Sequence, residues 1–210
     1  MNKYIKYPRT AHFKNSECVT EDDIINNDDI FVGKKVVASI KMDGECTTLY
    51  NDYIHARSID SSNHESRSWV KNFHNSIKFK IPNNYRICGE NLYAKHSIYY
   101  DNLDSYFLGF SIWNDKNKCL QWNDTIELFN ILNITPVPVF YIGNFDYEKI
   151  YKIFNTQYKD NHEGFVVRLF GEFYYDYFDK SVLKWVRKNH VTSDTHWSQS
   201  KIIKNKLRNT

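Results

Sequence analysis

The chain has 210 residues and a formal net charge of +3, with 41% hydrophobic and 25% charged residues. These values are ordinary for a soluble globular protein with one good-sized core. No apolar run approaches the roughly 18 residues of a membrane span, and residues 1–8 lack the apolar stretch of a secretory signal. The four cysteines lie far apart, which indicates neither a zinc site nor a disulfide framework. We therefore expect an intracellular, cytoplasmic monomer with no membrane partner.

The first half of the chain predicts short strands followed by one helix. The strands are expected over residues 35–40, 47–50 and 53–57, as consecutive antiparallel strands with tight turns at Asp43-Gly44 and Asn51-Asp52. Residues 65–77 have helical spacing, because their apolar side chains fall on one stripe. That stripe consists of Trp69, Val70, Phe73 and Ile77.

The second half mixes strands and helices again. Strands are expected over residues 85–92, 104–113, 163–170 and 182–186. Helices are expected over residues 125–132, with Asn123 or Asp124 as the N-cap, and over residues 147–154. The prolines within residues 136–138 predict an extended connection. Because the strands and helices follow no strict βαβ rhythm, the sequence predicts an α+β fold with largely antiparallel sheets.

Charge is distributed unevenly along the chain. Acidic residues gather early, at 21–23 and 28–29, whereas lysines and arginines gather from Lys180 onwards. A basic end resembles a phosphate-binding face, and a solvated terminus explains the last ten residues equally well. We expect one domain over residues 1–197 and a basic C-terminal tail over residues 198–210.

Lys41 opens the tetrad Lys41-Met42-Asp43-Gly44, between an apolar run and a β-prone one. A lysine at the end of a strand is well placed to be a covalent nucleophile, where neighbouring cations or desolvation favour its neutral amine. The tetrad also describes an ordinary hairpin turn with Asp-Gly at its corner, and alone it favours that explanation. The residues that follow reverse this preference.

Five further residues stand in or beside apolar, strand-like runs. They are Arg57, Glu90, Phe110, Glu163 and Lys184. Taken singly, the polar ones are explained as surface cations, ion-pair partners or a snorkelling lysine, and Phe110 as a core residue. An unpaired charge is costly to bury in such a run, so charges that recur there point to a shared polar site between sheets.

The order lysine, arginine, glutamate, aromatic, glutamate, lysine resembles the ordered motif set of the covalent nucleotidyltransferases. These comprise DNA ligases, RNA ligases and mRNA-capping enzymes. The chain is similar to the ATP-dependent RNA ligase branch, the compact phage and bacterial RNA-repair ligases, from about residue 33 to residue 197. The resemblance implies a ligase-type nucleotidyltransferase domain, with two mainly antiparallel sheets flanked by helices and the nucleotide pocket between the sheets.

The resemblance also implies which residues perform the chemistry. Lys41 would attack the α-phosphorus of ATP, expel pyrophosphate and become lysyl-AMP. Lys184 would bind the α-phosphate and stabilise the transition state. Glu163 would help to hold a divalent cation, Mg²⁺ or Mn²⁺, that neutralises charge on the phosphates.

Further residues would hold the nucleotide if the resemblance is carried over. Arg57 would contact a phosphate or the ribose, and Glu90 would accept a hydrogen bond from a ribose hydroxyl. Phe110 would stack on the adenine. The position of Ile40 is often occupied by glutamate in relatives, so adenine recognition there is expected to rest on backbone groups.

The chain departs from the family pattern at two other places. Many relatives have aspartate where Ser111 follows the aromatic residue. The last motif usually reads Lys-x-Lys, whereas the second lysine is replaced here by Val186, with Arg187 next along the chain. Arg187 is the expected substitute cation, although strand alternation would turn it away from Lys184 unless the strand ends or bulges there.

The sequence thus predicts an ATP-dependent RNA ligase that seals RNA with 5′-phosphate and 3′-hydroxyl ends in RNA repair. Only about two dozen residues follow Lys184, too few for the five-stranded barrel that DNA ligases append, which favours RNA as the substrate. Two alternatives stay open. One is a DNA ligase or nick sealer with the same chemistry, and the other is a non-catalytic nucleic-acid-binding module on the same fold.

Overall fold

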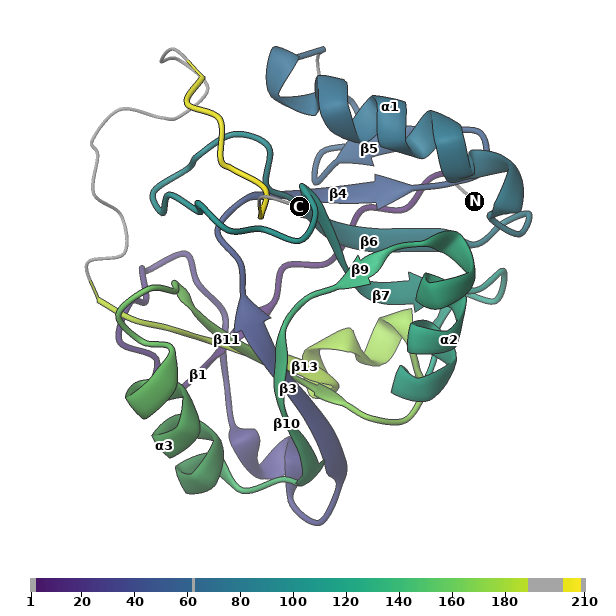
Figure 1. Cartoon of the computed structure of the whole chain (residues 1–210). Helices are drawn as coiled ribbons and strands as arrows, with labels where there is room; N and C mark the ends of the chain where they lie inside the picture. The colour runs from purple at the N-terminus through teal and green to yellow at the C-terminus, as the bar shows by residue number, and fades with distance from the viewer. Residues whose placement is uncertain (1–2, 62, 189–201, 209–210) are drawn as a thin grey trace.

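The computed structural model describes residues 3–61, 63–188 and 202–208. Two sheets form its centre, and the first of them lies in the lower half of Figure 1. Its strands follow the order β10, β3, β11, β13, β1 and β2. Their bounds are Val139–Asn144 (β10), Lys35–Lys41 (β3), Gly164–Leu169 (β11), Val182–Val186 (β13), Ala11–Phe13 (β1) and Ile25–Asn26 (β2).

The second sheet follows the order β12, β8, β7, β6, β4 and β5, with β9 beside β7. Its bounds are Phe173–Tyr174 (β12), Lys118–Cys119 (β8), Phe107–Trp113 (β7), Arg86–Asn91 (β6), Glu45–Leu49 (β4), Ile54–Ala56 (β5) and Thr135–Pro136 (β9). Pairing is mainly antiparallel; β1 is parallel to β13 and to β2, and β9 is parallel to β7. The predicted α+β fold with two mainly antiparallel sheets is therefore confirmed.

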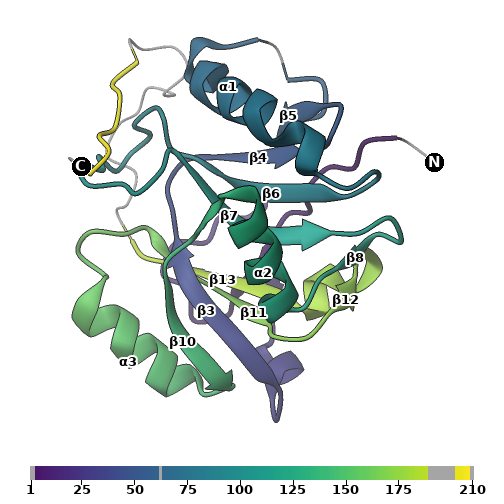
Figure 2. The same cartoon turned by 45° about the vertical axis from the view of Figure 1, so that its right-hand side comes forward.

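Helices cover the outer faces of both sheets (Figures 1 and 2). Helices α1 (Ser68–Ile77) and α2 (Trp122–Leu132) lie against the second sheet, and their apolar side chains share one core cluster with it. Helix α3 (Tyr147–Gln157) lies against the first sheet. Short 3-10 turns occupy Asp28–Phe31, Glu65–Arg67, Lys78–Lys80 and Tyr175–Lys180. Within the described ranges, none of the helices has the length and apolarity that crossing a bilayer requires.

Strand β3 shows how the first sheet divides its side chains between two faces. Successive side chains of a strand point to opposite sides. Ala38 and Ile40 enter the apolar core, where the Phe154 ring of α3 lies 5.2 Å from the Phe165 ring of β11. Lys41 instead lines a cavity between the two sheets. The alternation of side chains along β3 thus places core residues on one face of the sheet and site residues on the other.

The predicted hairpin between β3 and β4 is wrong. Strand β3 pairs with β10 and β11, whereas β4 pairs with β5 and β6, so the Asp43-Gly44 turn crosses from the first sheet to the second. The Asp43 carboxylate accepts hydrogen bonds of 2.7 Å from the amides of Ser97 and Ile98, which holds the turn away from a hairpin path. A Cβ at Gly44 would lie 2.6 Å from the Asn91 carbonyl oxygen, so this crossing needs glycine.

Other predicted elements differ at their ends. Helix α2 begins at Trp122 rather than Thr125, and neither Asn123 nor Asp124 is its N-cap, because Gln121 takes that position. Helix α3 is three residues longer than expected and is capped by Asp146, which accepts from the Lys149 amide. The sequence predicted none of the strands β1, β2, β8, β9, β10 and β12.

Part of the predicted basic tail belongs to the folded body. Within residues 202–208, Asn205 is fully buried, and its side-chain amide donates to the Leu92 carbonyl over 2.8 Å. The Asn205 Oδ1 accepts from the Tyr100 amide over 2.9 Å, and the Tyr106 hydroxyl donates to the Asn205 carbonyl. The segment 202–208, called the C-terminal strap below, therefore fastens the loop that follows β6.

Candidate active site

A cavity of about 540 Å³ lies between the two sheets. Both sheets and the segment before β1 contribute to its lining. Six of the eight residues that the sequence predicts for the site line it: Ile40, Lys41, Arg57, Glu90, Phe110 and Lys184. Glu163 and Arg187 do not line the cavity. The fold thus brings together residues that lie up to 144 positions apart, from 40 to 184.

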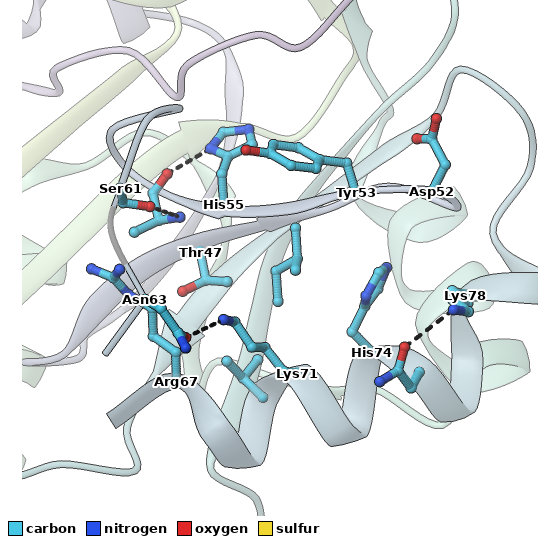
Figure 3. Close-up of a pocket in the computed structure, with 14 residues that line it drawn as sticks. Thr47, Asp52, Tyr53, His55, Ser61, Asn63, Arg67, Lys71, His74 and Lys78 are labelled. Carbon is cyan, nitrogen blue, oxygen red and sulfur yellow. Dashed lines mark hydrogen bonds between the residues drawn. The ribbon is translucent and has the colours of Figure 1, made fainter. Parts of the chain in front are cut away.

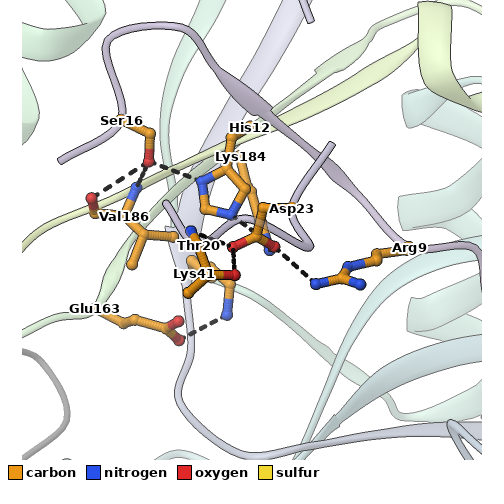
Figure 4. A network of polar contacts seen from close by, with 9 residues as sticks. All are labelled: Arg9, His12, Ser16, Thr20, Asp23, Lys41, Glu163, Lys184 and Val186. Carbon is orange, nitrogen blue, oxygen red and sulfur yellow. Dashed lines mark hydrogen bonds and ion pairs between the residues drawn. The ribbon is translucent and has the colours of Figure 1, made fainter. Parts of the chain in front are cut away.

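Lys41 and Glu163 form an ion pair at the edge of the cavity (Figure 4). The Lys41 Nζ donates to the Glu163 Oε2 over 2.6 Å. Gly164 pairs with Lys41 in the sheet register, and a Cβ there would lie 1.9 Å from the Trp185 carbonyl oxygen. Glycine therefore permits the close approach of β11 and β13 that brings the preceding Glu163 against Lys41.

The protonation of Lys41 is opposite to the expectation from its sequence. Burial lowers its pKa, but the charges of Glu163, Glu90 and Asp43 and the hydrogen bond to Glu163 outweigh burial, so that the pKa lies above the ordinary lysine value. Lys41 is thus a cation near neutral pH. The expected neutral amine requires the loss of this carboxylate pairing.

Lys184 lies on the same face of the first sheet as Lys41. It pairs with Val166, which pairs with Ser39, two residues before Lys41, so the side chains share a face. Its side chain is 18% exposed. Burial, and next the charge of Lys41, lower the pKa of Lys184 from the ordinary lysine value.

Glu90 brings a carboxyl group to the cavity from β6 in the second sheet. Burial raises its pKa to about 8, against the opposing effect of Lys41, and the charges of Glu163, Asp43 and Glu45 raise it further. Glu90 is consequently mostly protonated at neutral pH. A protonated carboxyl group can donate one hydrogen bond and accept others.

A β-bulge places Phe110 in the cavity. In the pairing of β6 with β7, Cys88 faces Ser111 and Gly89 faces Gly109, so that Phe110 is the extra residue. A bulge re-aims a side chain, and bulges are frequent beside active sites. The Phe110 ring meets the Tyr7 ring edge-on at a centroid distance of 5.1 Å.

Ile40 and Arg57 reach the cavity in different ways. The Ile40 side chain is 2% exposed and belongs to the core under α3, which is why we assign its contribution to the backbone. Arg57 follows the last residue of β5, is exposed, and stands on the rim. Contact between the Ile40 backbone and adenine stays a prediction.

Arg187 is turned away from the cavity. Strand β13 ends at Val186, and the Arg187 Nε donates to the His162 carbonyl over 2.8 Å. Strand alternation explains this direction, because Arg187 is an odd number of positions from Lys184. Arg187 therefore does not line the cavity in this structure, and its substitution for the missing second lysine stays a prediction.

The carboxylate of Glu163 is suitable as a ligand of a divalent cation that also binds phosphate. Among the described residues no three histidine, cysteine, aspartate or glutamate side chains form a metal cage. Mg²⁺ usually takes one or two carboxylates, with phosphate oxygens and water as its other ligands. Glu163, whose carboxylate pairs with Lys41, fits this kind of site.

Residues that the sequence did not predict lie at the cavity or directly behind its lining. Arg9 lines its rim, and Asp23 lies between Arg9, His12 and Lys184 (Figure 4). His12 pairs with Lys184 in the parallel register of β1 and β13. No motif marks these residues, because only strand pairing connects them with the site.

A second cavity of about 440 Å³ lies between β5 and α1 (Figure 3). Its lysines are already engaged, since Lys71 donates to Asn63 over 2.5 Å and Lys78 donates to Asn75 over 3.2 Å. None of the predicted site residues lines it. The cavity between the sheets is therefore the candidate active site.

Solved structures with the same fold are RNA ligases. A lysine-to-alanine variant of Naegleria gruberi RNA ligase with ATP and Mn is 17% identical, with a TM-score of 0.58 over 89% of this chain and 57% of that chain. An archaeal ATP-dependent RNA ligase is 13% identical, with a TM-score of 0.59 over 87% of this chain and 48% of that chain. The chain thus spans 57% of the length of the Naegleria ligase and less of the archaeal one.

Sequence comparison agrees with the fold. No curated protein sequence matches the chain significantly. The sequence pattern of the RNA ligase family matches residues 34–186, most of the 210 residues and all of the motifs from Lys41 to Lys184. The chain belongs to the RNA ligase family.

Proposed function

We propose that this protein is an ATP-dependent RNA ligase that seals 5′-phosphate and 3′-hydroxyl RNA ends through a lysyl-AMP intermediate, in RNA repair. The observation that carries the proposal is the convergence of Lys41, Arg57, Glu90, Phe110 and Lys184 on one cavity between two sheets. The similar Naegleria structures contain ATP or AMP with Mn, which supports ATP and a divalent cation as cofactors here.

In the first step the Lys41 nitrogen attacks the α-phosphorus of ATP. A nitrogen–phosphorus bond forms while the bond between the α-phosphorus and the bridging oxygen breaks, and pyrophosphate leaves with that electron pair. The ammonium must lose a proton beforehand, and the Glu163 carboxylate, 2.6 Å away, is positioned to receive it. Mg²⁺ or Mn²⁺ held through Glu163 would supply positive charge that neutralises the phosphates.

The other side chains bind and orient the nucleotide. Lys184, on the face shared with Lys41, meets the charge that develops on the α-phosphate. The Phe110 ring offers a stacking surface for adenine, and the Glu90 carboxyl group binds a ribose hydroxyl. Arg57 on the rim has the planar fork that fits phosphate.

The next two steps use RNA. The 5′-phosphate of one RNA end attacks the phosphorus of lysyl-AMP, which frees Lys41 and leaves an adenylylated RNA end. The 3′-hydroxyl of the other end then attacks the 5′-phosphorus, forms the phosphodiester and releases AMP. Both steps displace a group from phosphorus, so the same cations serve them.

Labelling with ATP that is radioactive in its α-phosphate tests the proposal. With Mg²⁺ or Mn²⁺, label should remain on denatured wild-type protein and on Lys34→Ala, which removes an exposed lysine seven positions earlier. Lys41→Ala and Lys41→Arg should retain no label, yet seal RNA that is already 5′-adenylylated. Normal labelling of Lys41→Ala would overturn the assignment.

The substrate is tested by matched RNA and DNA breaks at equal salt concentration. Wild-type protein should seal the RNA break faster. Faster sealing of DNA would replace the RNA ligase with the DNA nick sealer, and covalent labelling without sealing of either substrate would reject both.

A further inference from the structure

Arg9 is a cation on the rim of the cavity, in the segment that precedes β1. It lies outside residues 34–186, which the family pattern matches. Its side chain is 42% exposed, and its guanidinium Nη2 donates to Asp23 Oδ1 over 3.0 Å. A guanidinium carries five N–H donors, so this contact leaves most of them available to a ligand in the cavity.

Asp23 holds Arg9 beside Lys184 (Figure 4). Its Oδ2 accepts hydrogen bonds from the backbone amide and the hydroxyl of Thr20, over 3.0 Å and 2.9 Å, which fix the carboxylate. Its Oδ1 faces Arg9 at 3.0 Å, the His12 Nε2 at 3.4 Å and the Lys184 Nζ at 3.9 Å. Two cations of the cavity therefore share one anchored carboxylate oxygen.

The strand that carries Lys184 offers no second cation to the cavity. Val186 is apolar and 3% exposed, and Arg187 donates to the His162 carbonyl and does not line the cavity. ATP nevertheless brings three phosphates, of which Lys41 attacks only the first. The charge on the other two phosphates needs a partner, and Arg9 is the arginine next to Lys184 on the rim.

We propose that Arg9 supplies this second cation and binds the β- and γ-phosphates of ATP, and then the pyrophosphate as it leaves. This inference rests on the proposed ligase function. As the bond from Lys41 to the α-phosphorus forms, the bond to the bridging oxygen breaks, and its electron pair adds negative charge to the pyrophosphate. The Arg9 fork can bind two phosphate oxygens at once, and a phosphate would compete with Asp23 Oδ1 for it.

Four variants separate Arg9 from its alternatives. Arg9→Ala removes the cation, and Arg9→Lys keeps the charge but loses the planar guanidinium group. Arg187→Ala removes the arginine that the sequence predicts as the substitute for the second lysine of the last motif. Arg208→Ala is the matched control, because Arg208 pairs with Asp104 on the surface and is 60% exposed. All three positions are exposed enough or peripheral enough for the four variants to fold.

Two rates should respond to Arg9. One is the labelling of Lys41 at increasing ATP concentration, and the other is the discharge of preformed lysyl-AMP by added pyrophosphate. Arg9→Ala should raise the half-saturating concentrations of ATP and of pyrophosphate about ten- to a hundredfold, as the loss of a charge-assisted hydrogen bond implies. Arg9→Lys should recover part of this loss, and Arg187→Ala and Arg208→Ala should behave as wild type.

Sealing of 5′-adenylylated RNA distinguishes this role from a structural one. That substrate contains no pyrophosphate, so Arg9→Ala should seal it at the wild-type rate. The inference would be overturned if Arg9→Ala slowed sealing as much as it slowed the labelling of Lys41, or if its half-saturating pyrophosphate concentration equalled that of wild type. It would also be overturned if Arg187→Ala, and not Arg9→Ala, weakened the use of ATP and pyrophosphate.

The inference and the proposed function can fail separately. If wild-type protein formed no lysyl-AMP, the proposed function would fail. Calorimetric titration with pyrophosphate would then still test Arg9, because equal affinities of wild-type protein and Arg9→Ala would reject it as a phosphate ligand.

Discussion

The ion pair between Lys41 and Glu163 sets the protonation of the proposed nucleophile. Burial acts to lower the pKa of Lys41, but the charges of Glu163, Glu90 and Asp43 raise it above the ordinary lysine value. A protonated amine has no lone pair and cannot attack phosphorus. Whatever weakens the pair with Glu163 therefore activates Lys41.

Glu163→Gln keeps the shape of the side chain and removes its charge. We expect the pKa of Lys41 to fall, because the strongest of the neighbouring charges that raise it is lost while burial remains. The rate at which a small amine-reactive reagent modifies Lys41 should then reach half its maximum at a lower pH, measured by mass spectrometry without ATP or metal. Glu172→Gln, which breaks the surface pair with Lys118, is the control. An unchanged midpoint in Glu163→Gln would contradict the pairing.

Glu90 makes stability depend on pH in the opposite sense to most carboxylates. Burial raises its folded pKa from 4.5 to about 8, so the folded protein holds a proton that the unfolded chain releases. Its contribution to stability is therefore full below pH 4.5 and declines as the pH rises towards 8. Glu90→Gln cannot ionise and should escape this loss.

Urea unfolding at three pH values checks this expectation. Relative to wild type, Glu90→Gln should gain stability between pH 5 and pH 8, by up to a few kcal/mol on the scale of about 1.4 kcal/mol per pKa unit. Taking the difference between the two proteins removes the titration of the other groups. A difference that is the same at every pH would show that the Glu90 carboxyl group has an ordinary pKa.

At the residue scale, the sequence predicted the side chains that belong to ordered motifs. Six of its eight site residues line one cavity, since each sits in or directly beside a strand whose apolar neighbours were recognisable. Arg9 and Asp23 could not be predicted, because the pairing of β1 with β13 brings them beside Lys184 across more than 160 positions. The direction of Arg187 follows from alternation along the strand, which predicts that Arg187 and Lys184 point to opposite faces.

At the scale of elements, local patterns predicted the strands and helices with clear periodicity. Strand pairing was harder to predict from the sequence, as the Asp43-Gly44 turn shows. Its sequence is that of a hairpin, but the bonds from the Ser97 and Ile98 amides to Asp43 direct the chain into the other sheet. Partners more than 50 positions away thus overrule local turn preference.

The C-terminal strap reaches the nucleophile turn through hydrogen bonds. Asn205 Oδ1 accepts from the Tyr100 amide, and the Tyr100 hydroxyl accepts from the Asp43 amide over 3.0 Å, two residues beyond Lys41. The loop that carries Tyr100 also supplies His96 to the cavity. The strap therefore stabilises a loop that forms part of the site.

Asn205→Ala should destabilise the fold by about 2–3 kcal/mol, because it leaves the Tyr100 amide and the Leu92 carbonyl buried without partners. Urea unfolding measures the loss, and hydrogen exchange of the Tyr100 amide should accelerate more than that of the β6 amides. Asn102→Ala removes an exposed asparagine of the same loop that accepts from Arg208, and should change stability by less than about 0.5 kcal/mol. Equal effects of the two variants would reject the strap as a support of the loop.

At the scale of the whole molecule, the two sheets meet around one cavity. Lys41 and Lys184 come from the first sheet, whereas Glu90 and Phe110 come from the second. A nucleotide bound there would contact both sheets and would therefore stabilise the entire fold rather than one element. The cavity between β5 and α1 touches the second sheet alone and offers a competing location with two lysines.

Unfolding in the presence of an ATP analogue with a non-cleavable α–β bridge decides between the two locations. At a hundredfold excess over its dissociation constant, a ligand that binds only the folded protein adds about 2.7 kcal/mol to the free energy of unfolding. Lys184→Ala removes a cation from the cavity between the sheets and should weaken this stabilisation, because more analogue is then needed for the same occupancy. Lys71→Ala removes a cation from the cavity beside α1 and should leave the stabilisation intact. The reverse pattern would place the nucleotide against α1 and would contradict the assignment of Lys41 as its target.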